Sequence, residues 1–224
     1  MKISAFFDSQ HADDLLPLPL HYRILRRFEV TREEVAAQLL PGGDALLDIG
    51  CGDGEVAESV AGRYGHIVAT DLSPAALARA ATARRQACSW MVLDASRRLP
   101  FADASFSTVM SLSTLQYVFD PAAFLSEAHR VLRPGGYLLV ETPNVAYLPQ
   151  RLRLLSGNPI RTSYWRHGID GGNLHYFTVD ALCGLVAAAG FTPEQVTGSG
   201  VFAPLRTWRV SLLCGNVFVL ARRR

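Results

Sequence analysis

A short apolar run that ends at an acid and breaks into spaced glycines constrains this chain more than any other segment. Residues 46–54 read Leu-Leu-Asp-Ile-Gly-Cys-Gly-Asp-Gly, and a helical pattern begins at once with Glu55. Glycine permits a positive φ and lets a ligand approach the backbone without a Cβ in the way. The segment therefore predicts a buried strand, a tight turn and a helix whose N-terminus faces a ligand.

The glycine spacing argues against the dinucleotide-binding fingerprint. The third glycine of G-x-G-x-x-G would fall on Glu55, whereas the chain reads D-x-G-x-G-x-G from Asp48 to Gly54. Turns from strand to helix also use glycine for steric reasons alone. The spacing therefore disfavours a nicotinamide dinucleotide as the ligand.

Length and composition predict one α/β domain with a well-buried core. The chain has 224 residues, of which 49% are hydrophobic and 19% charged, and its formal net charge of +2 is too small to indicate a nucleic-acid partner. No apolar run approaches the ~20 residues of a membrane span, and the N-terminus does not resemble a signal peptide. The cysteines lack C-x-x-C spacing, which favours free thiols and a cytoplasmic location.

Strand and helix patterns alternate from about Thr31, which is typical of a parallel sheet covered on both faces. The predicted strands are Ala45–Ile49, His66–Thr70, Trp90–Leu93, Phe106–Ser111, Tyr137–Glu141, Phe191–Gly198 and Asn216–Ala221. The predicted helices are Glu55–Tyr64, Pro74–Arg85, Pro121–Leu132, Val179–Ala189 and Thr207–Leu213. The interval 144–173 breaks this alternation, and a loop of that length in a compact domain is usually functional.

Several residues fall at the carboxyl ends of the predicted parallel strands, where open α/β sheets bind their ligands. They are Asp48, Gly50, Cys51, Gly52, Gly54, Asp71, Leu72, Asp94, Ala95, Ser111 and Leu112. An acid at the end of the second strand, here Asp71, accepts ribose hydroxyls in such sheets. The alternative for Asp71 is a structural role before the helix that starts at Pro74. Together these residues predict a site for a nucleotide-like ligand.

Five segments of the chain occur in the order and spacing of the class I S-adenosylmethionine (SAM)-dependent methyltransferases. They are LLDIGCGDG, ATDLSP, VLDA, FSTVMSLSTLQYV and EAHRVLRPGGYLLVETPN. The chain resembles this family over nearly its whole length. The resemblance implies a Rossmann-like α/β fold with a seven-stranded, mostly parallel sheet, helices on both faces and a small cap. It further implies a single domain over 1–224, with residues 1–30 as a cap segment and 144–173 as an insert over the active site.

The same resemblance implies SAM as the cofactor and S-adenosylhomocysteine as its product. The three turn glycines would bring backbone N–H groups to the cofactor's carboxylate, and Asp48 would either hold the turn or face the ammonium group. In this family an Asp at the position of Asp94 takes the adenine amino group. Ser111 and Leu112 would flank the methionine part, and Tyr22 would close over the cofactor.

Methyl transfer from a sulfonium needs alignment first and a base only if the acceptor must lose a proton. His175 is the candidate base; the alternative is that it bonds a loop carbonyl and pins the insert. Tyr117, Tyr147, His167, Tyr176 and Arg151 are candidates for the acceptor pocket. The arginines of the insert form either a solvated face or contacts to an acidic acceptor. No cluster has metal-ligand spacing, so no metal is expected.

We consider three functions from the sequence. The first is an enzyme that methylates a small molecule. The second follows from the segments PNVAYLPQRLRLLSGNP and GGNLHYFTVDALCGL, which resemble MetW-like as well as ubiquinone-type methyltransferases. It is a cofactor-binding regulatory partner of a methionine-biosynthesis enzyme. The third, a nucleic-acid or protein methyltransferase, is disfavoured by the near-neutral charge and the missing N-P-P-Y signature. A homodimer through an apolar edge at Val217–Leu220 is also open.

Overall fold

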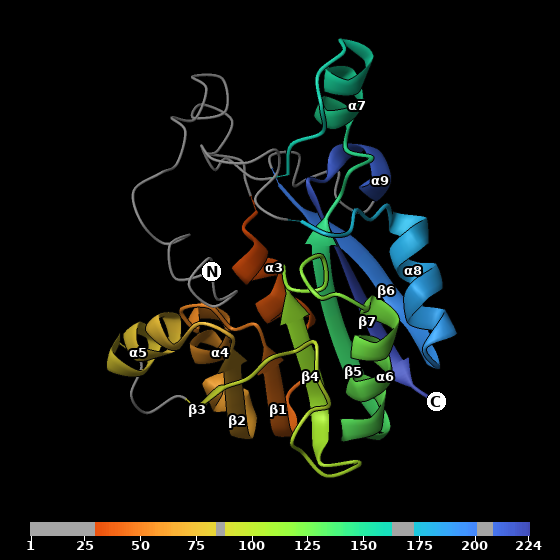
Figure 1. The fold of residues 1–224 in the computed structure, drawn as a ribbon. Coiled ribbons are helices and arrows are strands. Elements are labelled where there is room, and N and C mark those ends of the chain that lie inside the picture. Colours follow the sequence, from red (N-terminus) through yellow and green to blue (C-terminus); the bar gives the residue numbers. More distant parts are fainter. Residues whose placement is uncertain (1–29, 84–87, 163–172, 201–207) are drawn as a thin grey trace.

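A seven-stranded sheet forms the centre of the computed structural model, which describes residues 30–83, 88–162, 173–200 and 208–224 (Figure 1). The strands lie in the order β3-β2-β1-β4-β5-β7-β6. They are β1 (Gly43–Ile49), β2 (Tyr64–Asp71), β3 (Ser89–Val92), β4 (Phe106–Leu112), β5 (Leu132–Pro143), β6 (Phe191–Ser199) and β7 (Asn216–Arg223). β1 to β5 pair in parallel, and β7 is antiparallel to both of its neighbours. The predicted seven-stranded, mostly parallel sheet is confirmed.

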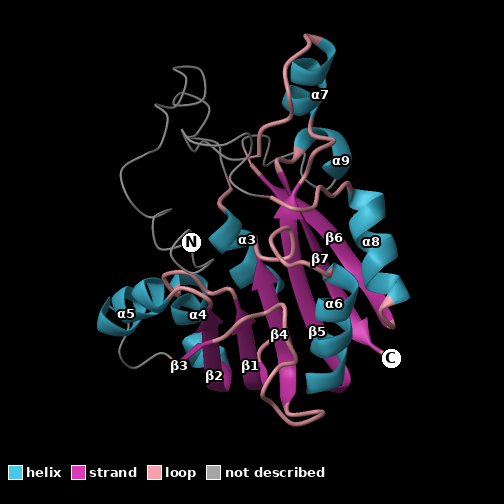
Figure 2. Cartoon of the chain, in the orientation of Figure 1, coloured by secondary structure: helices cyan, strands magenta, loops and turns pink. Residues whose placement is uncertain are grey.

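Helices flank the sheet on both faces, as predicted (Figure 2). They are α3 (Arg32–Leu39), α4 (Glu55–Ser59), α5 (Pro74–Ala83), α6 (Pro121–Val131), α7 (Leu148–Leu155), α8 (Val179–Ala188) and α9 (Val210–Leu213). Alternate residues of one strand enter different cores because side chains of a strand alternate between its faces. Leu46 packs with residues of α3 and α4, whereas Leu47 packs with residues of α6 and α8. None of the described helices is long and apolar enough to cross a membrane.

The last strand does not lie at an edge of the sheet, which contradicts the proposal that Val217–Leu220 pairs with another chain. β7 inserts between β5 and β6, and it bonds both along its length. Val217, Phe218 and Val219 are therefore fully buried. Within the described sheet the edge strands are β3 and β6.

The helix predicted over Glu55–Tyr64 is shorter than expected. α4 ends at Ser59, a 3-10 turn covers Ala61–Arg63, and β2 already begins at Tyr64. Gly62 weakens a helix at this point, and an aromatic residue is favoured in a strand. The buried Tyr64 hydroxyl accepts a hydrogen bond from the Gly42 N–H, and this contact joins the start of β2 to the start of β1.

The described part of the interval 144–173 contains one helix that the alternation of patterns did not reveal. α7 begins after Tyr147, with a proline in its first turn, where the missing N–H costs nothing. The buried Asn144 side chain ties the beginning of the interval to the body, since its Nδ2 donates to the carbonyls of Ser211 and Cys214. α3 was also not predicted, although Thr31 and Glu34 form a capping box at its N-terminus.

Candidate active site

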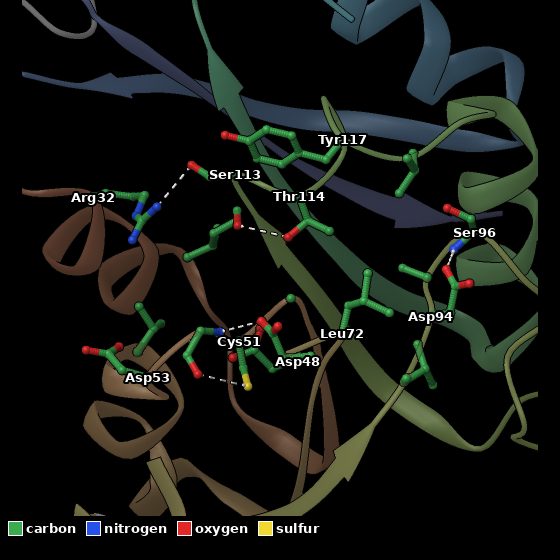
Figure 3. A pocket seen from close by; sticks show the side chains of 18 of the residues that line it. Arg32, Asp48, Cys51, Asp53, Leu72, Asp94, Ser96, Ser113, Thr114 and Tyr117 are labelled. Atoms are coloured by element: carbon green, nitrogen blue, oxygen red, sulfur yellow. Dashed lines mark hydrogen bonds between the residues drawn. The ribbon is translucent and has the colours of Figure 1, made fainter. Parts of the chain in front are cut away.

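A cavity of about 630 Å³ lies at the carboxyl ends of β1, β2, β3 and β4 (Figure 3). The residues that the sequence singled out and that line this cavity are Asp48, Gly50, Cys51, Gly52, Asp71, Leu72, Asp94, Ala95, Leu112 and Tyr117. The strands bring them together because their carboxyl ends meet at one edge of the sheet. The geometry is thus that of a ligand site at the edge predicted for it.

Two of the predicted cofactor residues have structural positions instead. Ser111 is fully buried inside the sheet, and its Oγ donates to the carbonyl of Ile49. Gly54 caps α4 with φ +77°, and a Cβ there would lie 2.5 Å from the Trp90 ring. Neither residue is among those that line the cavity.

The N–H groups of the turn glycines all have partners within the fold. The N–H groups of Gly50 and Cys51 both donate to the carbonyl of Thr70, at 2.8 and 2.9 Å. The Gly54 N–H donates to the carbonyl of Cys51, and the Gly52 N–H donates to the Asp71 carboxylate. The fold thus uses the N–H groups of Gly50, Gly52 and Gly54, and a contact from them to the cofactor's carboxylate stays a prediction.

Asp71 holds the turn from the end of β2. Its Oδ2 accepts from the Gly52 N–H at 2.9 Å and its Oδ1 from the Ser73 N–H at 2.8 Å. The capping hydroxyl of α5 belongs to Ser73, which accepts from the Ala76 N–H. Each carboxylate oxygen has a second lone pair. Asp71 therefore shapes the turn and still presents acceptors to the cavity that it lines.

Asp94 lies on the far side of the cavity from Arg32 (Figure 3). Its Oδ1 accepts from the Ser96 N–H at 3.0 Å, and its Oδ2 pairs with Arg97 at 3.1 Å. Leu72 lies between Asp48 and Asp94 along the wall (Figure 3). The cavity thus has polar groups at both ends and an apolar side chain between them.

Asp48 is a buried acid at the base of the cavity, with 3% of its surface exposed. Burial raises the pKa of Asp48 to about 8, and the negative charge of Asp71 acts in the same direction. The positive charge of Arg32 opposes the shift. A cation bound beside Asp48 would stabilise its ionised form and lower this pKa.

Replacement of Asp48 by Asn is expected to flatten the dependence of stability on pH. The folded-state pKa of about 8 lies above the ~3.9 of an unfolded Asp, so the folded chain keeps a proton that the unfolded chain has lost. This contribution to stability is complete below pH ~4 and is lost as the pH rises to about 8. Urea unfolding measures the free energy of unfolding of both proteins at pH 5 and pH 9. Relative to wild type, D48N should be more stable at pH 9 than it is at pH 5. If the unfolding free energies of D48N and wild type differed by the same amount at both pH values, the raised pKa of Asp48 would be contradicted.

A second cavity of about 390 Å³ adjoins the first and shares four wall residues with it, namely Arg32, Glu33, Ser113 and Tyr117. Of these four residues, only Tyr117 was predicted from the sequence. Arg32 and Glu33 belong to α3, which the capping box at Thr31 would have revealed. Ser113 follows directly after β4, two residues beyond the predicted strand end at Ser111, and no local pattern distinguishes it.

His175 and three residues predicted for the acceptor pocket lie outside the walls of both cavities. His175 is half-buried, and its Nε2 lies 3.2 Å from the carbonyl of Phe119, which is the contact expected of the structural alternative. Tyr147 precedes α7, Arg151 is exposed with its Nε bonded to the Ala146 carbonyl, and Tyr176 is 47% exposed. None of these four lines either cavity. Tyr22 and His167 lie outside the described residues.

The fold and this strand-end site define a class I methyltransferase. A family model described as a methyltransferase domain matches residues 47–140. The chain is 34% identical over 77% of its length to a protein of Mycolicibacterium smegmatis named as a probable SAM-dependent methyltransferase. It is 28% identical over 87% of its length to a ubiquinone biosynthesis O-methyltransferase of Cereibacter sphaeroides, 81% of which is covered.

A solved SAM-dependent methyltransferase of Thermotoga maritima has the same fold. Its TM-score is 0.65 at 21% identity, with 99% of this chain and 98% of that chain covered. The chain therefore belongs to the class I SAM-dependent methyltransferases. It spans about three fifths to two thirds of the first curated relatives, 61% of the M. smegmatis protein and 66% of a demethylmenaquinone methyltransferase of Tropheryma whipplei.

The residues of the larger cavity fit SAM, the cofactor of this family. A Cβ on Gly52 would meet nothing within 4 Å, so the backbone of the turn is open to the cavity. Asp71 presents acceptors at the end of β2, where ribose hydroxyls bind in related sheets. The acids in the wall suit a ligand that carries a sulfonium and an ammonium group. They are Glu33, Asp48, Asp53, Glu55, Asp71 and Asp94.

Proposed function

We propose that this chain transfers the methyl group of SAM to a small-molecule acceptor. The observation that carries the proposal is the pair of adjoining cavities, one lined by the residues predicted to bind the cofactor and one beside it. SAM supplies the reactive methyl group on its sulfonium. The chain aligns that group with the acceptor and excludes water, and orientation of this kind contributes about 7–11 kcal/mol to catalysis.

The positions of two arginines of the insert weaken the expectation of an acidic acceptor. Arg151 and Arg153, on α7, use their Nε atoms to bond carbonyls of neighbouring residues, and neither lines a cavity. Arg32 is the arginine in both walls, and it is paired with Glu33 at 2.9 Å. We therefore propose an acceptor without a negative charge.

Asp71→Ala is the variant that tests the cofactor site. It removes the acceptors for the ribose and the contact that holds the Gly52 N–H. Since each hydrogen bond to a charged group contributes about 1.5–3 kcal/mol, the Kd for SAM should rise on the order of 100-fold. Calorimetric titration with SAM and S-adenosylhomocysteine measures this change.

Asp180→Ala is the matched control, because Asp180 is an exposed acid in the first turn of α8. Thermal unfolding of each variant shows whether weaker SAM binding comes from a change in the site or from unfolding of the chain. Equal Kd values for wild type and D71A would refute the assignment of the cavity. Binding of SAM without formation of S-adenosylhomocysteine in the presence of any acceptor would favour the alternative function, a MetW-like regulatory partner of a methionine-biosynthesis enzyme.

A further inference from the structure

Ser113 stands at the junction of the two cavities and lines both. Its φ of +50° is in the left-handed region, which is disfavoured for residues other than glycine. Backbone strain of this kind persists only where the surroundings impose it, and it is concentrated at functional sites. The strained conformation therefore marks Ser113 as a candidate functional residue.

The Ser113 hydroxyl connects a buried acid to an arginine. Its Oγ donates to Glu141 Oε2 at 2.8 Å and accepts from Arg32 Nη1 at 3.0 Å (Figure 3 shows the contact with Arg32). A hydroxyl has one hydrogen and two lone pairs. Those two bonds use the hydrogen and one lone pair, so the second lone pair is left for a donor in the cavities.

Glu141 is a fully buried carboxyl group at the carboxyl end of β5. Its Oε1 has no hydrogen-bond partner within the described parts of the chain. Burial raises the pKa of Glu141, whereas Arg32 and the Ser113 hydroxyl favour its ionised form, and the nearby Glu33 opposes that form. Such an acid takes up a proton readily, and the cofactor wall does not use it.

The second cavity offers mostly uncharged polar groups to a ligand. Gln116 lines it, is 2% exposed, and its Oε1 has no partner among the described residues. Ser199 and Asn216 belong to the same wall. The single cation of the wall, Arg32, already contacts Glu33 and Ser113. These groups suit a neutral molecule with hydroxyl groups better than an anion.

We propose that the second cavity binds a neutral hydroxylated acceptor and that Ser113 and Glu141 remove the proton of its reacting hydroxyl. This inference rests on the proposed methyl transfer. The acceptor oxygen forms its bond to the methyl carbon as the S–CH3 bond breaks, and that electron pair goes to the sulfur. The hydroxyl proton passes to Ser113 Oγ while the Ser113 proton passes to Glu141 Oε2. The neutral Glu141 then releases its proton to solvent when the product leaves.

Glu141→Gln tests this relay, with Glu194→Gln as the matched control at an exposed acid of β6. The probes are catechol as a neutral hydroxyl acceptor, benzoate as an anion and histamine as an amine, each incubated with SAM while S-adenosylhomocysteine is measured. We expect turnover of catechol by wild type, and a kcat that rises with pH as Glu141 ionises. In E141Q kcat should fall about 10²–10⁴-fold and lose that rise with pH, while the Kd for SAM is unchanged.

Ser113→Gly is the second variant, because glycine accepts the positive φ of this position while it removes the hydroxyl. It should lose kcat on catechol as E141Q does and should keep SAM binding. Turnover of benzoate or histamine alone, no turnover of catechol while SAM binds, or an E141Q variant with the wild-type pH profile would each overturn the proposal. Failure of the wild-type chain to bind SAM would instead refute the proposed function itself.

Discussion

Gly50→Ala is expected to destabilise the chain and to abolish SAM binding together. Gly50 has φ +81°, and a Cβ at this position would lie 1.9 Å from Thr114 Oγ1. The positive φ costs about 1–2 kcal/mol for alanine. The overlap with Thr114 costs about 1–3 kcal/mol more, because that side chain has to move. A loss of about 2–5 kcal/mol corresponds to a Tm lower by on the order of 10 °C.

Two other glycines serve as matched controls for Gly50→Ala. Gly157 has φ +77° and open space around it beyond α7, so G157A measures the cost of the positive φ alone. Gly52 has φ +55° and likewise open space, but it lines the cavity, so G52A should weaken SAM binding with a small change in Tm. Thermal unfolding and SAM titration of the three variants separate three effects. These are the cost of the positive φ, the cost of the overlap with Thr114, and the loss of space for SAM. A Tm for G50A equal to that of G157A would show that the Thr114 side chain moves aside without loss of stability.

The turn at Gly50 could be predicted from the sequence because its constraints are local. The apolar run, the acid and the spaced glycines are adjacent in the chain, and they specify the strand, the turn and the start of the helix together. Asp71 and Asp94 could be placed for a related reason, since Asp71 ends β2, Asp94 follows two residues after β3, and parallel strands align their ends.

The position of β7 could not be predicted in this way. A run such as Val217–Leu220 reads equally well as an edge strand or an interior strand, since pairing partners on either side are set by distant parts of the chain. Ser113 and its partners Arg32 and Glu141 illustrate the same limit. These three residues come from α3, the end of β4 and the end of β5, and only the folded sheet places them within hydrogen-bond distance.

Phe218→Ala is expected to be the most destabilising single change in the core of the C-terminal strands. Phe218 is fully buried, and its Cα is in register with Glu141 of β5 and Thr197 of β6. Its side chain belongs to the core that also contains residues of α3 and α4. Truncation of a buried phenylalanine costs about 3–5 kcal/mol, a large part of the ~5–15 kcal/mol that a typical domain has. Urea unfolding of the variant measures the loss.

Phe119→Ala is the control for this variant, because Phe119 is 83% exposed and should change the unfolding free energy by about 0.5 kcal/mol or less. Phe218→Leu should give an intermediate loss, since leucine fills part of the same space. The register next to Glu141 adds a functional consequence, because collapse of the core around Phe218 would displace the end of β5. F218L should therefore lower kcat more than it raises the Kd for SAM, because none of the residues that line the larger cavity belongs to β5, β6 or β7. Equal unfolding free energies for F218A and F119A would mean that β7 does not have the buried, central position described for it.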